Sequence, residues 1–340
     1  MARSVPLHLG FAARWLLVLW AGGVVGLAAA QGTGKHGTAR GAEPRERTVS
    51  EWLMRMHEAS RSRNYVGTFV VSSGVGALAS ARIWHACKGD LQMERVESLT
   101  GTPRSTFRRD DEVLTFLPEQ RVVRSERRES LGLFPDTLRA PDSGIGEFYA
   151  ARRTGGERVA GFDADVVNLA PKDALRFGYR IWSEKKSGLV LKTQTLDGDG
   201  NVLEQAAFSE LQLDAPVRIE RLAQMMAVPE GWRVEKPDAH KTTPAAEGWQ
   251  LKAPVAGYKP MSCYKRPAEG AMQWIFSDGL ASLSLFVETY DPKRHTQEGV
   301  FASGATHTLF QRVQDWWLTA VGEVPPQTLK AFAQNLERRR

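Results

Sequence analysis

The sequence predicts an α+β protein dominated by antiparallel strands, with one large, unclosed sheet followed by a smaller α/β domain. Between residues 64 and 213, short segments rich in β-branched and aromatic residues alternate with Gly, Pro and Asp, which is typical of successive antiparallel strands. Residues 229–247 are rich in Pro, Lys and Glu, the composition of a linker. We therefore expect a large domain over 48–226, a linker over 227–247 and a small domain over 248–340.

The first 30 residues have the pattern of a secretory signal peptide. Arg3 and Arg14 provide positive charge, residues 15–30 are apolar, and the run ends in three alanines that offer an A-x-A cleavage site. The run is shorter than the roughly 20 residues of a membrane-spanning helix. We expect cleavage after Ala30 and export of the mature chain; an uncleaved anchor is the alternative.

Two helices are predicted at the ends of the mature chain. Thr48, with Glu51 three residues later, forms a capping box before an amphipathic helix. Pro326 begins a closing helix, because proline is favoured in the first helical turn.

Several predicted strands have apolar residues on both faces. Leu114 and Phe116, for example, alternate with Val113 and Leu117. A sheet with one solvated face alternates more strictly between apolar and polar residues. Either the first helix or an apolar ligand must therefore cover the second face.

Two glycine-rich motifs are better explained as turns than as ligand sites. "GVGALA" (74–79) matches a dinucleotide fingerprint but is followed by a strand instead of the required helix. "DGDGN" (197–201) resembles the start of a calcium loop, but the glycine and glutamate needed later in that loop are Val202 and Phe208.

Ser277, Asp278, His295 and His307 raise the hypothesis of a hydrolase. The chain has no G-x-S-x-G motif, and Asp278 with Gly279 suits a two-residue hairpin loop between two strands. We therefore expect a hairpin and no enzyme, and the sequence indicates no cofactor.

Seven arginines lie between residues 104 and 128. Charged strand edges that prevent sheet-to-sheet pairing explain such a cluster. A basic rim that binds phosphates or carboxylates is the functional alternative, and beside an apolar sheet it would suit a lipid with an anionic head group. The cluster consists of Arg104, Arg108, Arg109, Arg121, Arg124, Arg127 and Arg128.

Cys87 and Cys263 are the two cysteines of the chain. In an oxidising compartment they could form a disulfide between the two halves, or remain two separately buried thiols. Two cysteines and scattered histidines do not indicate a zinc site. The formal net charge of +6 falls to +4 when residues 1–30, which carry Arg3 and Arg14, are removed (43 − 39), and this excess is too diffuse to indicate nucleic acid binding.

The mature chain resembles the RseB/MucB family over nearly its whole length. The segments that carry the resemblance occur in the same order in both predicted domains. They are "NYVGTFV" (64–70), "MERVESLTGTPR" (93–104), "ERVAGFDADVVNLAPKDALRFGYRIW" (157–182), "LEQAAFSEL" (203–211), "FSDGLASLSLFVE" (276–288) and "VGEVPPQTLK" (321–330).

The resemblance implies an unclosed β-barrel similar to LolA and LolB, packed on helices, and a small α/β domain after a linker. It also implies a periplasmic regulator of the sigma-E envelope stress response. Such a protein binds the periplasmic segment of a transmembrane anti-sigma factor, shields it from the first protease and is released by lipid or lipopolysaccharide. A periplasmic lipid or lipoprotein carrier is the alternative, and a homo-oligomer is left open.

With the resemblance, we expect the hairpin turn near Ser277 to be exposed and to hold the protein partner. Trp316 and Trp317 are adjacent on a predicted strand and must face opposite sides. One is expected in the core and the other could anchor the partner; burial of both under the closing helix is the alternative. The expected partner-binding residues are Asp278, Gly279, Leu280, Glu288, Arg294 and Trp316. The expected lipid-binding residues, chosen from apolar positions, are Phe69, Val71, Ile83, Phe116, Phe134 and Phe148.

Overall fold

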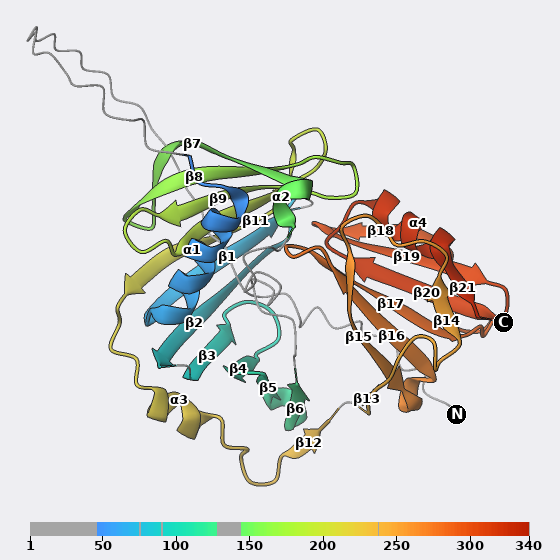
Figure 1. The fold of residues 1–340 in the computed structure, drawn as a ribbon. Coiled ribbons are helices and arrows are strands. Elements are labelled where there is room, and N and C mark those ends of the chain that lie inside the picture. The colour runs from blue at the N-terminus through green and yellow to red at the C-terminus, as the bar shows by residue number, and fades with distance from the viewer. Residues whose placement is uncertain (1–45, 75, 90, 128–143, 237, 340) are drawn as a thin grey trace, which may run out of the picture.

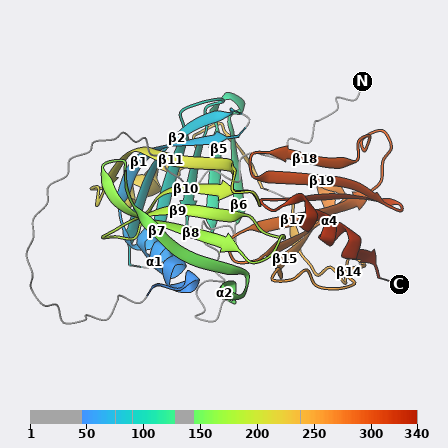
Figure 2. The same ribbon diagram turned by 90° about the horizontal axis from the view of Figure 1, so that it is seen from above.

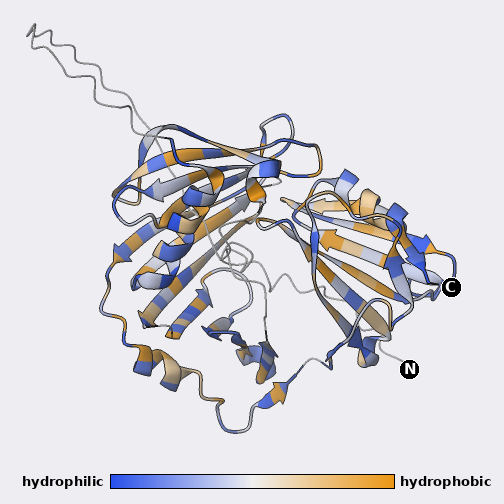
Figure 3. Cartoon of the chain, in the orientation of Figure 1, coloured by the Kyte–Doolittle hydropathy of each residue, from blue (hydrophilic) through white to orange (hydrophobic). Residues whose placement is uncertain are grey.

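The computed structural model describes residues 46–74, 76–89, 91–127, 144–236 and 238–339. These residues form a large and a small antiparallel sheet, each with its own helices (Figure 1). The predicted α+β class with dominant antiparallel strands is confirmed. Polar and apolar residues alternate along many strands (Figure 3), as expected where one face of a strand is more buried than the other.

The large sheet has twelve strands in the order β12-β6-β5-β4-β3-β2-β1-β11-β10-β9-β8-β7. It is unclosed in the described part of the chain, because edge strands β7 and β12 do not pair with each other. Its strands are β1 (Tyr65–Ser73), β2 (Leu78–Lys88), β3 (Leu91–Ser98), β4 (Ser105–Arg109), β5 (Glu112–Leu117), β6 (Val122–Arg127), β7 (Tyr149–Val159), β8 (Phe162–Pro171), β9 (Gly178–Glu184), β10 (Val190–Leu196), β11 (Val202–Leu213) and β12 (Arg233–Glu235).

The two glycine-rich motifs are hairpin turns, as predicted. The first joins β1 to β2, which pair antiparallel. The second joins β10 to β11, where the Asp197 carboxylate accepts hydrogen bonds from the backbone N–H groups of Asp199 (3.0 Å) and Asn201 (2.8 Å).

Helix α1 (Val49–Ser62) begins at the predicted capping box. The N–H of Glu51 donates to Thr48 Oγ1 (3.2 Å), and the N–H of Thr48 donates to the Glu51 carboxylate (2.7 Å). The buried side chains of Trp52 and Met56 pack in a cluster with residues of β8, β9 and β10. Burial of this face, together with the cap, explains why a short helix is stable here.

Helix α3 (Ile219–Met225) covers part of the opposite face of the large sheet. The adjacent β2 residues Ile83 and Trp84 show this, because their side chains point to opposite faces. Ile83 packs in a cluster that includes Ala59 of α1, whereas Trp84 packs against the cluster that contains Leu222 of α3. Helices therefore cover apolar residues on both faces, as the two-sided apolar strands required.

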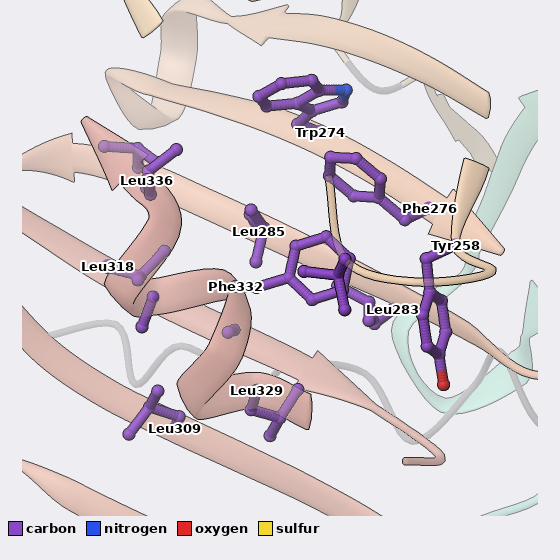
Figure 4. Close-up of a cluster of buried hydrophobic side chains, with 14 of the residues drawn as sticks. Tyr258, Trp274, Phe276, Leu283, Leu285, Leu309, Leu318, Leu329, Phe332 and Leu336 are labelled. Carbon is purple, nitrogen blue, oxygen red and sulfur yellow. The ribbon is translucent and has the colours of Figure 1, made fainter. Parts of the chain in front are cut away.

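The small sheet has seven strands in the order β13-β15-β16-β17-β20-β19-β18, beside a two-stranded sheet β14-β21. Helix α4 (Pro326–Asn335), predicted from Pro326, packs Leu329 and Phe332 into its core (Figure 4). The strands are β13 (His240–Lys241), β14 (Trp249–Leu251), β15 (Lys259–Arg266), β16 (Ala271–Ser277), β17 (Ser282–Thr289), β18 (Gly299–Ser303), β19 (Thr306–Val313), β20 (Trp316–Gly322) and β21 (Leu336–Arg338).

The segment predicted to be a linker is attached to both sheets. Its strand β12 pairs in parallel with β6 of the large sheet, and its strand β13 pairs antiparallel with β15 of the small sheet. Backbone hydrogen bonds at both ends therefore restrict a segment whose composition predicted only a linker.

The small domain meets the large domain at the end where the short helix α2 (Ile145–Phe148) lies (Figure 2). Each domain contributes one leucine to the other. Leu175, in the loop between β8 and β9, packs against the core of the small domain. Leu280, in the turn between β16 and β17, packs against the cluster under α1. The carbonyl oxygen of Leu175 also accepts hydrogen bonds from Tyr258 Oη (3.0 Å) and Thr328 Oγ1 (2.7 Å).

A buried ion pair lies between these two leucines. Arg176 Nε and Asp278 Oδ2 are 2.9 Å apart, and both side chains are 0% exposed. The guanidinium also donates to the carbonyl oxygen of Ala256 (2.7 Å) and stacks on the rings of Phe148 (4.3 Å) and Tyr258 (4.8 Å). Its planar shape suits simultaneous ionic and aromatic contacts.

The Asp278 carboxylate is surrounded by donors from both domains. Its Oδ1 accepts from the N–H groups of Leu280 (2.9 Å) and Ala281 (2.8 Å), and its Oδ2 accepts from Tyr149 Oη (3.2 Å). Burial raises the pKa of Asp278, and the two N–H groups, Arg176 and Tyr149 oppose that effect. A buried pair of this kind adds little net stability, but removal of one partner is costly because it leaves an unpaired charge.

Asp278→Asn is expected to lower the free energy of unfolding by about 2 kcal/mol, because the buried guanidinium of Arg176 then loses one of its two carboxylate partners and keeps Asp173 of its own loop. The double variant Arg176→Met/Asp278→Asn should lose at least about 1 kcal/mol less than the sum of the single variants. Urea unfolding followed by tryptophan fluorescence measures both. Asp214→Asn, at the exposed pair with Arg63 (3.0 Å), is the matched control and should cost less than about 1 kcal/mol. Equal losses at positions 278 and 214 would contradict the assignment.

A buried histidine makes the large domain sensitive to pH. His85 is 1% exposed, donates from Nδ1 to the carbonyl oxygen of Arg63 (2.7 Å) and stacks on Tyr65 with ring centroids 4.8 Å apart. Burial lowers its pKa from the usual 6.5. The unfolded chain therefore binds the proton more readily, so the stability contributed by neutral His85 is complete above pH 6.5 and is lost as the pH falls below it.

His85→Gln should reduce the loss of stability between pH 7 and the lowered pKa, because glutamine does not titrate. At pH 8 the variant should be about 1 kcal/mol less stable than the parent, through weaker hydrogen bonding and lost stacking. The free energy of unfolding measured at several pH values tests this. Parallel pH profiles for parent and variant would show that His85 does not contribute.

Candidate functional site

The predicted partner-binding turn is not exposed. Asp278 as a whole residue is 7% exposed, with its side chain fully buried, and Gly279 is also buried. The predicted hairpin is confirmed, because β16 and β17 pair, but its loop runs over residues 278–281 and is longer than the two residues expected. The Ser277 hydroxyl donates to the carbonyl oxygen of Ala281 (2.9 Å) across this loop. The expectation of an exposed turn is wrong, because the loop that carries Arg176 packs onto it. Asp278, Gly279 and Leu280 serve the contact between the domains.

Glu288 and Arg294 lie on the face of the small sheet opposite α4, here named the second face. Arg294 Nη2 and Glu288 Oε2 are 2.9 Å apart, and His295 Nε2 lies 3.4 Å from Glu288 Oε1. His295 Nδ1 accepts a hydrogen bond from the N–H of Asp291 (2.9 Å), which places the ring proton on Nε2. The ring is therefore oriented from both sides.

The two adjacent tryptophans face opposite sides of β20, as predicted. Trp317 is buried on the second face and stacks on His295, with centroids 4.7 Å apart and planes at 7°. Trp316 is half-buried on the α4 side, where it meets Trp249 edge to face at 5.5 Å and the Arg338 guanidinium at 4.6 Å. Trp316 therefore lies apart from Glu288 and Arg294, and the structure does not bring the predicted partner residues into one site.

The second face carries a half-buried aromatic surface. Phe286 and Phe310 are partly exposed. The Phe310 ring lies 6.3 Å from that of Trp317, and the Arg266 guanidinium lies 5.8 Å from the Phe286 ring. Phe301, at the edge strand β18, is 42% exposed and packs on Phe310 at 5.6 Å. Aromatic residues bordered by charges are typical of surfaces that bind protein segments.

Several arginines of the predicted basic rim are already bound within the chain. Arg108 forms an ion pair with buried Glu94 (2.8 Å), and Arg124 pairs with Glu235 of β12 (3.4 Å). Arg104 donates to Ser98 Oγ (3.1 Å). Of the others, Arg109 and Arg121 are exposed, while the side chain of Arg127 and all of Arg128 lie outside the described residues.

The predicted lipid-binding residues do not line one cavity. Phe69, Ile83 and Val71 belong to the cluster at the C-terminal end of α1. Phe116 lies on the opposite face, in the cluster under α3, and Phe148 lies at the contact between the domains. Phe134 is outside the described residues. Apolar positions in strands predict which residues are buried, but they do not predict which of these residues lie on the same face.

Cys87 and Cys263 are free thiols in different domains. Cys87 lies in β2, and its N–H donates to Asn64 Oδ1 (2.8 Å). Cys263 lies in the core of the small domain. Burial raises the pKa of Cys263 to about 11. The expected alternative of two separately buried thiols therefore holds for Cys263, whereas the Cys87 thiol is half-buried, and the two are not joined by a disulfide.

One basic groove was missed by sequence reasoning. It lies between α3 and the large sheet and includes Trp84, Arg95 and Arg221. Arg82 and Trp84 share a face of one strand at i and i+2, which was a readable signal.

Among the described residues, no group of three or more His, Cys, Asp or Glu side chains could hold a metal ion. Within the same ranges, no helix has both the length and the apolar character needed to cross a membrane.

Comparison with known proteins identifies the family. The model of the MucB/RseB N-terminal domain matches residues 48–226, and the model of the MucB/RseB C-terminal domain matches residues 243–337. The sigma factor AlgU regulatory protein MucB of Pseudomonas aeruginosa is 28% identical over 306 residues, covering 85% of this chain and 90% of that protein. The sigma-E factor regulatory protein RseB of Escherichia coli K12 is 26% identical over 299 residues, covering 84% and 89%.

Solved structures agree with this fold. The structure of MucB in complex with MucA(peri) has a TM-score of 0.62 and 23% identity, and it covers 86% of this chain and 99% of that one. The Pseudomonas aeruginosa MucA/MucB complex has a TM-score of 0.65 and 24% identity, with the same coverage.

With models matched in both parts of the sequence, the chain belongs to the MucB/RseB family of sigma factor regulatory proteins.

Proposed function

We propose that this chain is a periplasmic negative regulator of a sigma-E-type envelope stress response. After export and cleavage following Ala30, it binds the periplasmic segment of a transmembrane anti-sigma factor and shields that segment from the first protease. Lipid or lipopolysaccharide releases it. The observation that carries the proposal is the similarity of both domains to MucB, which has been solved in complex with MucA(peri).

The second face of the small sheet is the surface that best suits such a segment. It combines the half-buried rings of Phe286 and Phe310 with the charged pair of Glu288 and Arg294. An extended or helical segment with apolar and charged side chains would bury the rings and exchange ionic contacts. Coupled folding of a flexible segment costs ordering entropy, which keeps such a complex reversible.

The geometry around Ser277 supports a binding protein over a hydrolase. The hydroxyl donates to Ala281 and accepts from the N–H of Gly279 (3.1 Å). Both contacts stabilise the turn, so the Ser277 hydroxyl has a structural role.

Phe310→Ala should weaken binding of the anti-sigma segment more than tenfold, because loss of a central aromatic contact commonly costs about 2 kcal/mol. Calorimetric titration of the mature chain with the periplasmic segment of the cognate anti-sigma factor measures this. Leu99→Ala, at a 52% exposed leucine of the large domain, is the matched control and should leave affinity unchanged. Absence of binding by the parent chain would overturn the proposed function, whereas equal affinity of parent and Phe310→Ala would overturn only the location.

A further inference from the structure

Strand β18 forms one edge of the small sheet (Figure 2). Its five residues include neither a charged residue nor a proline, and it pairs with β19 without a bulge. Phe301 is 42% exposed, and Ala302 and Ser303 are also exposed. An edge strand presents N–H and C=O groups that can pair with another strand, and natural edges usually have charges, proline or a bulge that prevent such pairing. The edge at β18 has none of these protections.

The other edges of the two large sheets are protected. Strand β7 has exposed Arg152, Arg153 and Arg158 and a bulge beside Thr154. Strands β12 and β13 have only three and two residues, and both include charged residues. The open edge at β18 is therefore specific to this strand and is not a general property of the fold.

The hairpin that contains β18 determines which of its backbone groups face outward. A two-residue loop joins the paired residues Ser303 and Thr306. Residues that flank such a loop exchange backbone hydrogen bonds, and bonded and non-bonded pairs then alternate along the two strands. The N–H and C=O groups of Val300 and Ala302 therefore point away from β19, towards the open edge.

The open edge is continuous with the aromatic surface of the second face. Gly299 pairs with Phe310 of β19. A Cβ atom at Gly299 would have a single described neighbour within 4 Å, the Phe301 ring at 3.9 Å, so there is space beside the rings of Phe301 and Phe310, which lie 5.6 Å apart. A side chain placed opposite Gly299 by an added strand would contact both rings.

Both ends of β18 are fixed within the chain. At the hairpin tip, a Cβ atom at Gly304 would lie 2.6 Å from Glu204 Oε2 and 3.3 Å from Ser73 Cβ, so the tip packs directly on the large sheet. Just before β18, the Glu298 carboxylate accepts a hydrogen bond from the N–H of Arg312 (3.2 Å). Because the edge is already ordered, pairing with it costs mainly the ordering of the partner.

A flexible, extended segment fits this edge better than a second copy of the chain. The five residues of β18 span about 17 Å, and two such edges paired with each other would provide little of the at least about 1,200 Å² that a stable complex buries. A flexible segment can instead pair with β18 and continue over the second face. Arg312 of β19 favours an acidic residue in that segment, because its exposed guanidinium stacks on Tyr290 (4.1 Å) and forms no ion pair with another described residue.

We propose that β18 pairs through its main chain with an extended segment of the anti-sigma factor, so that the segment becomes an added strand of the small sheet. Alternate side chains of the segment then cover Phe301 and Phe310, as in other complexes formed by strand addition. The inference rests on the proposed function, because it names the element of the small domain that binds the segment and the conformation that the segment takes.

Ala302→Pro tests the main-chain pairing, because proline removes the outward N–H of residue 302 and leaves the hydrogen bonds between β18 and β19 intact. In calorimetric titration with the periplasmic segment of the cognate anti-sigma factor, the variant should bind about tenfold or more weakly than the parent, since it loses a hydrogen bond and its ring obstructs the added strand. Ala302→Val keeps the N–H at the same position. It is the matched control and should change affinity less than threefold.

Hydrogen exchange followed by mass spectrometry tests the same pairing without a variant. In the complex, the amides of residues 299–303 should exchange at least tenfold more slowly than in the free chain, because the N–H groups of Val300 and Ala302 become bonded. The amides of edge strand β7 should exchange at the same rate in both states. Unchanged exchange at β18 in a complex that forms would overturn the inference.

The outcomes separate this inference from the proposed function. Absence of segment binding by the parent chain would overturn the proposed function and the strand pairing together. Equal affinity of the parent and Ala302→Pro, with weaker binding by Phe310→Ala, would leave the second face as the site and overturn the strand pairing alone. A parent chain that sediments as a dimer and becomes a monomer in Ala302→Pro would assign the edge to a second copy and would also overturn the inference.

Discussion

The arrangement of the two domains depends on the buried pair of Arg176 and Asp278. The buried Asp278 carboxylate gains its arginine partner when the loop between β8 and β9 meets the turn between β16 and β17, whereas Arg176 also has Asp173 of its own loop. Gly257 shows how close this approach is, because a Cβ there would lie 2.0 Å from Arg176 Nη2 and the backbone has φ +78°. Leu175 and Leu280 bury apolar surface between the domains, whereas the ion pair fixes their relative orientation. A domain that slid or rotated would remove Arg176 from the buried carboxylate of Asp278, while Asp173 would stay beside Arg176.

Local features of the fold could be predicted from sequence because neighbouring residues determine them. The capping box at Thr48, the turn at Asp197 and the helix starting at Pro326 each depend on residues within one turn of chain. The alternation of apolar residues on both faces also indicated a covered sheet, although it did not identify α3 as one cover. The contact between Arg176 and Asp278 joins segments distant in sequence, and no local pattern encodes it.

The candidate sites were less predictable for the same reason. The sequence around Asp278 is typical of an exposed hairpin turn. The turn is buried because the other domain packs onto it. The apolar residues chosen for lipid were buried as expected but divided between faces, since strand pairing and helix placement decide which residues share a surface. Trp84 with Arg82 could have been recognised from their i, i+2 spacing, whereas Arg218 and Arg221 reach the groove only through the packing of α3.

The most direct measurement is the distance between the domains in solution, because the central claim is that Arg176 and Asp278 hold them together. Spin labels at Asp199→Cys in the large domain and Lys330→Cys in the small domain, with Cys87→Ser and Cys263→Ala, allow electron–electron double resonance. A single narrow distance distribution is expected in the otherwise unchanged chain, and a broad one after Asp278→Asn. An equally narrow distribution after Asp278→Asn would contradict the account, since other contacts would then suffice to hold the two domains.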